Sequence, residues 1–328
     1  MSGKTAFLFA GQGAQSVGMG KDLYEAWPAA RAIYDRAAAA LRPSGIDLLK
    51  VSFEGPDDEL KRTDVSQPAI VVCSLAALAA LEAELGGKLP PVAFAAGLSL
   101  GEYSALSFAG VLSLEDTLRL VIARGRHMQA CCDREPSGMT SLLGLGAADL
   151  GPALEAGRAL GPVGIANDNA PTQVVLSGAK AALEAAVAKA AAKRTFPLNV
   201  AGAYHSTLMA PAGEALARDL EQTALAAPRV PVISNVTAAE HAADAASIKQ
   251  LLVEQVSSTV RWRETMARMF AAGVERCYEF GPGGVLKGLV RQNDKSKSCT
   301  SVCTVADVKA AAAELSQPGW QPSTAVGA

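Results

Sequence analysis

Aromatic residues make up only 5% of this 328-residue chain, and charged residues only 19%. So few aromatic side chains argue against the stacking platforms with which proteins bind single-stranded nucleic acid. The charges nearly cancel, with 30 basic and 32 acidic residues, so the net positive charge of a nucleic-acid-binding protein is also missing. A hydrophobic share of 50% excludes a disordered chain and allows a large buried core. The length leaves room for about two domains.

Six cysteines are too few for a disulfide scaffold, and the chain has no pair of CxxC units, so we expect no structural zinc and no other metal. The N-terminal run MSGKTAFLFAGQG is too short and too little apolar for a signal peptide. No stretch of about 18 apolar residues runs without polar interruption, as a membrane span requires. We therefore expect a cytoplasmic protein that binds neither membranes nor nucleic acid.

Short β-rich runs alternate with longer Ala-rich stretches, which is typical of an α/β fold with a mainly parallel sheet. Strands are predicted at 5–10, 92–96, 231–235, 276–280 and 300–305, and helices at 67–85, 114–130, 261–272 and 285–292. Ser113 and Asp116 resemble a capping box at the start of the helix at 114–130.

The middle of the chain has a different order of elements. Strands are predicted at 139–144, 163–167, 173–177 and 196–200, with helices at 148–160 and 179–193. This βαββαβ order is that of a ferredoxin-like module. We therefore predict a small domain at 132–199, inserted into a larger α/β domain of residues 1–131 and 200–316, with a flexible tail at 317–328. A cleft between the two domains is the expected place for chemistry.

The sharpest motif is the GxSxG sequence GLSLG at residues 97–101. It lies between a predicted strand and a helix that starts near Glu102. On such a tight turn the glycines leave room for a strained backbone, and the serine hydroxyl projects at the helix N-terminus. A Gly-Ser-Gly turn that occurs by chance needs no strand before it and no helix after it. This context therefore favours Ser99 as a nucleophile.

A serine hydroxyl is a weak nucleophile until a base takes its proton, and the chain has only three histidines. His127 is predicted within a helix, and His241 in an exposed polar loop. His205 follows a strand and precedes a helix, where loops direct side chains into clefts, so it is the expected base. Asp168 could orient it by residue type but falls in the inserted module. Either a backbone carbonyl or an unrecognised loop must supply the third group.

One arginine of the helix at 114–130 stands apart from the others. At about 100° per residue, Arg119 and Arg126 share the solvated face, whereas Arg124 lies half-buried on the opposite flank. No carboxylate stands three or four residues away from it. Guanidinium groups bind carboxylates through two parallel hydrogen bonds, so a carboxylated substrate would satisfy Arg124. A salt bridge to a distant acid is the alternative.

Two glycine-rich turns are also present. GQGAQSVGMG at 11–20 matches neither GxGxxG nor a P-loop, so nucleotide binding is not supported. Its backbone N–H groups could instead face an oxyanion. GPGG at 281–284 is better explained by turn geometry at a helix start.

Together these motifs closely resemble those of malonyl-CoA:acyl-carrier-protein transacylases and the related acyltransferase domains of fatty-acid and polyketide synthases. The matching segments run in family order from residue 7 to about residue 291: FLFAGQGAQSVGMG, GLSLGEYSAL, ARGRHMQ, NDNAPTQVVLSG, AYHSTLMAPA, SNVTA, VSSTVRW and YEFGPGGVLKGLV. The resemblance implies an α/β-hydrolase-like core with a mainly parallel sheet and an inserted ferredoxin-like small domain.

The resemblance also implies a role for each site residue. Ser99 would carry the acyl group, and His205 would be its base, oriented by the main-chain carbonyl of Gln255. The N–H groups of Gln12 and Leu100 would form the oxyanion hole. The donor would be malonyl-CoA and the acceptor the phosphopantetheine thiol of acyl carrier protein, with no further cofactor.

Three residues bear on acyl selection. Arg124 would hold the malonyl carboxylate. Leu98 precedes the nucleophile where many members carry His, a departure that leaves the Ser–His chemistry untouched. Tyr204 precedes the base where malonyl-specific relatives often carry Phe and methylmalonyl-accepting ones Ser. Its ring should crowd an α-methyl branch, which favours malonyl.

Carrier proteins of this family are acidic, so four basic residues are candidates for docking: Lys287, Arg291, Arg261 and Arg263. A solvated charged face is the alternative interpretation. We expect a monomer. The competing hypotheses are a plain serine esterase or thioesterase of the α/β-hydrolase type, an acyltransferase of a polyketide pathway with another acyl-CoA, and a non-catalytic scaffold.

Overall fold

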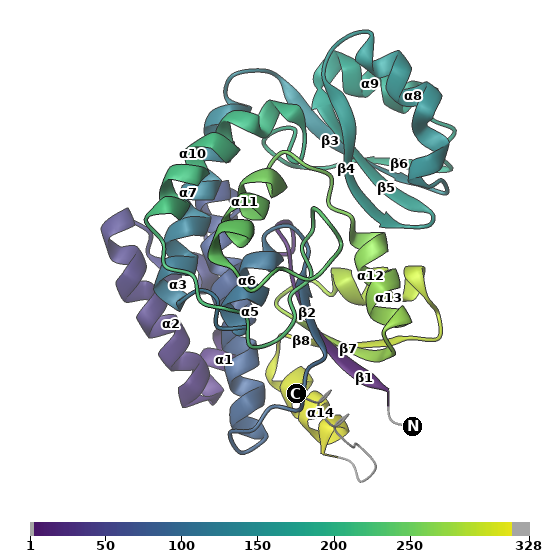
Figure 1. The fold of residues 1–328 in the computed structure, drawn as a ribbon. Coiled ribbons are helices and arrows are strands. Elements are labelled where there is room, and N and C mark those ends of the chain that lie inside the picture. Colours follow the sequence, from purple (N-terminus) through teal and green to yellow (C-terminus); the bar gives the residue numbers. More distant parts are fainter. Residues whose placement is uncertain (1–2, 317–328) are drawn as a thin grey trace.

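The computed structural model describes residues 3–316, so the tail predicted at 317–328 lies outside the described residues. Two separate sheets organise the chain (Figure 1). The main sheet has the order β2-β1-β7-β8 with parallel neighbours, and its strands are β1 (Lys4–Phe9), β2 (Phe94–Gly97), β7 (Val274–Phe280) and β8 (Ser298–Val302). The α/β class and the mainly parallel sheet predicted from the sequence are confirmed.

The second sheet is antiparallel, in the order β4-β5-β3-β6. Its strands are β3 (Ser137–Leu143), β4 (Val163–Ala170), β5 (Gln173–Ala179) and β6 (Arg194–Pro197). Helices α8 (Gly151–Arg158) and α9 (Lys180–Lys189) share a small apolar core with this sheet. The predicted βαββαβ order is therefore present between residues 137 and 197.

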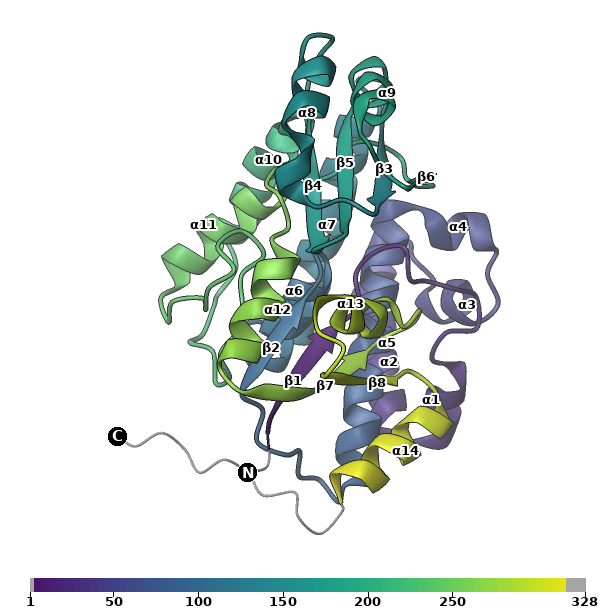
Figure 2. The ribbon, with the colours of Figure 1, turned by 90° about the vertical axis from the view of Figure 1, so that its right-hand side faces the viewer.

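Helices lie on both faces of the main sheet (Figure 2). Alternate side chains of β1 point to opposite faces. Phe7 and Phe9 join the larger core with α2, α5, α6 and α7, whereas Ala6 and Leu8 join a smaller core with α12 and α13. The helices outside the antiparallel sheet are α1 (Lys21–Ala26), α2 (Pro28–Leu41), α3 (Leu48–Phe53), α4 (Asp57–Lys61), α5 (Thr63–Glu84), α6 (Gly101–Phe108), α7 (Leu114–Cys132), α10 (Ala210–Glu221), α11 (Ala245–Gln255), α12 (Trp262–Ala271), α13 (Val285–Asn293) and α14 (Val305–Leu315).

Helix α5 is the single helix in residues 3–316 that is long and apolar enough, by its mean hydropathy, to cross a membrane. Polar residues interrupt its apolar run, as expected from the sequence for every such stretch. Within its 18-residue apolar window, 89% of the residues are buried inside the protein. The scattered polar residues of this window, such as Gln67 and Ser74, are themselves buried. The helix therefore has the burial of a core helix.

The prediction of a strand at 231–235 is wrong. This segment makes only single bridges, from Val232 to Ala95 of β2 and from Ile233 to Glu240. The chain reverses directly afterwards, and the Ser234 N–H and C=O groups are used inside that turn. The Pro231 carbonyl and the Ile233 N–H still bond to Ala95, so the loop that follows is held beside the end of β2.

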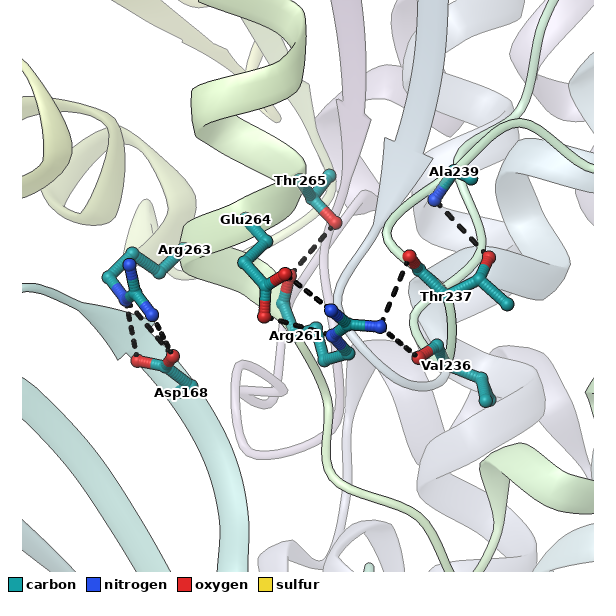
Figure 3. A network of polar contacts seen from close by, with 8 residues as sticks. All are labelled: Asp168, Val236, Thr237, Ala239, Arg261, Arg263, Glu264 and Thr265. Atoms are coloured by element: carbon teal, nitrogen blue, oxygen red, sulfur yellow. Dashed lines mark hydrogen bonds and ion pairs between the residues drawn. The ribbon is translucent and has the colours of Figure 1, made fainter. Parts of the chain in front are cut away.

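The start of α12 and the residues just before it contact β4; the contact of Arg263 with Asp168 is seen in Figure 3. Val260 donates its N–H to the Ala166 carbonyl at 2.8 Å and accepts from the Asp168 N–H at 3.0 Å, so it forms a one-residue parallel bridge beside β4. Arg263, in the first turn of α12, binds the Asp168 carboxylate with an Nη2–Oδ2 distance of 2.8 Å. These contacts fix the antiparallel sheet relative to α12.

Candidate active site

Ser99 lies in a sharp turn between β2 and α6. Its φ of 52° is in the left-handed region, which is rare for a residue other than glycine. A Cβ at Gly97 would collide with the Gly101 backbone, and a Cβ at Gly101 would collide with the Phe9 carbonyl of β1. The two glycines of the motif therefore allow the backbone to pack closely enough for this turn, as the GxSxG pattern predicts.

The structure brings Ser99 and His205 into contact across 106 residues of sequence. The Ser99 Oγ lies 2.7 Å from the His205 Nε2, and the His205 Nδ1 lies 2.9 Å from the Gln255 carbonyl. A carbonyl oxygen can only accept, so Nδ1 must carry the proton. In the neutral ring, Nε2 then holds the free electron pair and accepts the Ser99 hydroxyl proton. This arrangement can activate a serine without an acidic residue.

The other residues considered for the base or its partner lie elsewhere. Asp168 binds Arg263, not His205. His127 contacts Asp219 between α7 and α10, with an Nε2–Oδ2 distance of 2.8 Å. His241 was expected in an exposed loop, but its side chain is fully buried and its Nε2 lies 2.7 Å from Oε1 of a glutamate in α6.

Arg124 is more deeply buried than its predicted half-buried flank suggested, with only 1% of its surface exposed. Its Nη1 donates to the Gln67 Oε1 at 2.9 Å, and its Nη2 donates to the Ser99 Oγ at 2.9 Å and to the Gln255 Oε1 at 3.2 Å. Every acceptor is neutral, and in residues 3–316 its Nε has no acceptor at all. The expected alternative, a salt bridge to a distant acid, is not formed within that range. A buried cation with spare donors beside a serine hydroxyl is suited to a carboxylate.

The two predicted oxyanion donors come from the serine turn and from the loop packed against it. Leu100 follows Ser99 at the start of α6, and Gln12 lies in the glycine-rich loop after β1. The Gln12 side chain reaches the site through Gln67, whose Nε2 donates to the Gln12 Oε1 at 3.3 Å. Within the described range, neither the Leu100 nor the Gln12 N–H bonds to a protein acceptor. Both are free to donate to a ligand.

Known proteins resemble this chain along nearly its whole length. The acyl transferase domain family matches residues 6–314. This chain belongs to that family. The malonyl CoA-acyl carrier protein transacylase of Salmonella typhimurium is 42% identical to this acyltransferase over 293 residues, which cover 88% of the chain and 92% of the relative.

Solved structures agree with the family assignment. The acyl-carrier-protein S-malonyltransferase of Bartonella henselae matches with a TM-score of 0.90 and 41% identity, and the match covers 96% of this acyltransferase and 100% of that chain. A malonyl-transacylase in complex with its type II polyketide acyl-carrier protein matches with a TM-score of 0.89 and 36% identity, covering 95% and 99% of the two chains.

Besides Arg124, two residues were predicted to bear on acyl selection, and the structure places Tyr204 and Leu98 in different surroundings. Tyr204 is buried, and its hydroxyl lies 2.8 Å from the Thr63 Oγ1 at the start of α5, so its ring is fixed beside His205. Leu98 is partly buried against the smaller core, and a Cβ at Gly11 would collide with its carbonyl group. Leu98 therefore packs the serine turn against the glycine-rich loop that carries Gln12.

Sequence reasoning missed three polar side chains of the site. Gln67 links Arg124 to Gln12, and Asn235 accepts the Ser99 N–H at 2.6 Å and donates to the Gly97 carbonyl at 2.8 Å. Glu102 lies under the same turn. For Gln67 a signal was present, since it is a lone amide at the start of a long apolar helix. Asn235 and Glu102 carried no such signal.

The acid limb of kcat/KM of the acyltransferase should have its midpoint near pH 4. Burial, and to a lesser extent the charge of Arg124, lowers the pKa of His205 from 6.5 to about 4. Only the neutral ring can take the serine proton, so the rate is full above that pKa and is lost as the pH falls through it. Initial rates of serine acylation between about pH 3.5 and 8 measure the limb, with circular dichroism as the control for folding. A midpoint at 6.5 would contradict this assignment.

Proposed function

We propose that this acyltransferase moves the malonyl group from malonyl-CoA to the phosphopantetheine thiol of acyl carrier protein, and so supplies chain elongation in fatty-acid or polyketide synthesis. The observation that carries the proposal is the buried Arg124, which contacts the Ser99 Oγ but no carboxylate within residues 3–316. Its spare donors suit an acyl group with a free carboxylate. The printed names of the relatives, which are malonyl transferases of acyl carrier protein, support the same acyl group and acceptor.

The reaction proceeds in two half-reactions at one serine. The His205 Nε2 takes the Ser99 hydroxyl proton while the Oγ attacks the thioester carbonyl carbon. The C–S bond then breaks, and CoA leaves as a thiol with the proton from His205. In the second half, His205 takes the proton of the carrier thiol, the sulfur attacks the malonyl ester, and the Ser99 Oγ regains the proton.

The charge that develops on the carbonyl oxygen needs donors already in place. We assign this role to the N–H groups of Gln12 and Leu100, which are free within the described residues. One such donor is worth about 3 kcal/mol of transition-state stabilisation. The protein groups supply all the acid–base chemistry in this scheme, which requires no metal and no cofactor beyond the substrates.

The finer description of the fold also belongs to the proposal. We propose an α/β-hydrolase-like core of residues 1–131 and 200–316 and a ferredoxin-like subdomain of residues 132–199. The serine turn between β2 and α6 supports the first, and the βαββαβ order with the sheet order β4-β5-β3-β6 supports the second.

The docking surface for the carrier narrows to two of the four basic candidates. Arg261 binds Glu264 with an Nε–Oε1 distance of 2.9 Å, and Arg263 binds Asp168 (Figure 3). Lys287 and Arg291 are exposed on α13 and form no ion pair within residues 3–316. We therefore propose that Lys287 and Arg291 meet the acidic carrier. We also propose a cytoplasmic location, which fits the free thiols of all six cysteines, and a monomeric state.

Wild-type protein mixed with malonyl-CoA should gain one malonyl group on Ser99, and added holo carrier protein should remove it as malonyl-carrier. Intact-mass spectrometry of both proteins measures the two steps, and free malonate is measured in parallel. Ser99→Ala is the control and should stay unmodified. Free malonate as the main product would indicate a thioesterase, and a different preferred acyl-CoA would indicate a polyketide-type acyltransferase. A wild type without any adduct would indicate a scaffold.

A further inference from the structure

The carboxylate of Glu102, in the first turn of α6, is completely buried below the serine turn. Its Oε2 accepts from the Gln255 Nε2 at 2.7 Å and from the Asn235 N–H at 3.0 Å. Its Oε1 lies 2.7 Å from the His241 Nε2. A buried carboxylate with three N–H partners is strongly fixed in place, because each partner would be left unsatisfied without it.

Two residues donate to Glu102, Asn235 through its backbone N–H and Gln255 through its side-chain amide, and both also hold the backbone of the nucleophile. Asn235 bonds to the Ser99 N–H and to the Gly97 carbonyl, and the Gln255 Nε2 also donates to the Ser99 carbonyl at 3.0 Å. Ser99 keeps a left-handed backbone conformation that costs free energy for an L-residue. The surrounding structure must hold this conformation, and both residues that do so also donate to the Glu102 carboxylate.

Glu102 also stands at the end of a chain of contacts that starts at the cation of the site. The Arg124 Nη2 donates to the Gln255 Oε1, and the Nε2 of the same amide donates to Glu102. The two buried charges are therefore separated by one amide and do not pair directly. A direct ion pair would compensate the charge of Arg124, whereas the neutral amide leaves that charge available to a ligand carboxylate.

His241 completes the pair with Glu102 from the loop after residue 235. Its Nδ1 is buried and has no hydrogen-bond partner within residues 3–316. The Glu102 carboxylate oxygen accepts hydrogen bonds, so the His241 Nε2 that faces it carries a proton. His241 therefore donates to Glu102 and fixes the orientation of its carboxylate.

We propose that Glu102 is a positioning residue for acyl transfer, and that His241 in turn positions Glu102. The inference rests on the proposed chemistry at Ser99, since it concerns how that serine is held. Through Asn235 and Gln255, the carboxylate fixes the position of the serine turn relative to the Gln255 carbonyl, which orients His205. Within residues 3–316, the hydrogen bonds of Glu102 reach neither the Ser99 Oγ nor the His205 ring, so Glu102 acts through Asn235 and Gln255.

The test compares Glu102→Met, which fills the space without accepting hydrogen bonds, with Glu102→Gln. The amide oxygen of Gln can accept from Asn235 and Gln255 while its NH₂ donates to the other tautomer of His241. Two rates are measured: malonylation of Ser99 by malonyl-CoA, and labelling of Ser99 by a fluorophosphonate, which forms an O–P bond and releases fluoride. Thermal unfolding verifies that each variant is folded.

Glu102→Met should lower kcat of malonylation and the labelling rate by about 100-fold, with KM changed less than about threefold, since a displacement near 1 Å costs this much in rate. Glu102→Gln should stay within about tenfold of the wild type, because it keeps the hydrogen bonds. His241→Leu should lower both rates by about tenfold. The matched control is His127→Leu, which removes the half-exposed pair with Asp219 and should leave both rates unchanged.

A folded Glu102→Met protein with wild-type rates overturns the proposal, and so do equal losses in the Met and Gln variants. If Glu102→Met does not fold, unchanged rates in His241→Leu overturn it. Failure of the proposed function gives a different result: wild type that reacts with fluorophosphonate but not with malonyl-CoA. The comparison of Glu102 variants then continues with the fluorophosphonate alone.

Discussion

Replacing His205 with alanine should lower the rate of Ser99 malonylation by about a thousandfold, which is the usual contribution of a general base. The Ser99 Oγ has two close polar neighbours, His205 at 2.7 Å and Arg124 at 2.9 Å. Arg124 can only donate, so it cannot take the serine proton. Among residues 3–316, no other base lies within hydrogen-bond distance of the hydroxyl. Rapid-quench mixing with malonyl-CoA followed by intact-mass analysis measures the rate.

His127→Ala is the matched control for this loss. It removes a histidine that also bonds to a partner at 2.8 Å, but that partner is Asp219 and the side chain is 30% exposed. Its rate should equal that of the wild type. Malonylation of Ser99 at an undiminished rate in the His205 variant would assign the proton transfer to another group and remove the Ser–His pair from the mechanism.

The parts of the fold that were predicted from the sequence are those with a local signal. The strand and helix around Ser99, and the side-chain cap of α7 at Ser113, depend on residues a few positions apart. The strand expected at 231–235 failed for the opposite reason. Its pattern is that of a strand, but strand pairing depends on distant partners, and a turn after Ile233 leaves only single bridges.

The same distinction applies to the site. Ser99 and His205 could be selected because the turn motif is local and only three histidines exist. From the sequence, Arg124 could be predicted only to be half-buried. Its acceptors could not be predicted, because Gln67 and Gln255 lie in other helices. The contact of Glu102 with His241 spans 139 residues, so neither residue type nor spacing indicates it.

Arg124→Ala should reduce malonyl loading relative to acetyl loading by about two to three orders of magnitude. A charge-assisted hydrogen bond contributes about 1.5–3 kcal/mol, and each 1.4 kcal/mol is a factor of ten, so losing a bidentate grip has this effect. Burial lowers the pKa of Arg124, which shows that the site penalises a cation without a charged partner. An acetyl group leaves that penalty in place, whereas a malonyl carboxylate relieves it.

The measurement is the ratio of kcat/KM for malonyl-CoA and acetyl-CoA in wild type, Arg124→Ala and Arg124→Lys. Lysine keeps the charge but lacks the planar fork that reaches Gln67, Ser99 and Gln255 together, so its ratio should lie between the other two. Arg124→Met should fold at least as stably as the wild type, because a buried charge is replaced by an apolar chain of similar length. An unchanged malonyl-to-acetyl ratio in Arg124→Ala would mean that the acyl carboxylate lies elsewhere. The buried guanidinium would then serve only to hold Gln67 and Gln255, and the choice of malonyl would lose its physical basis.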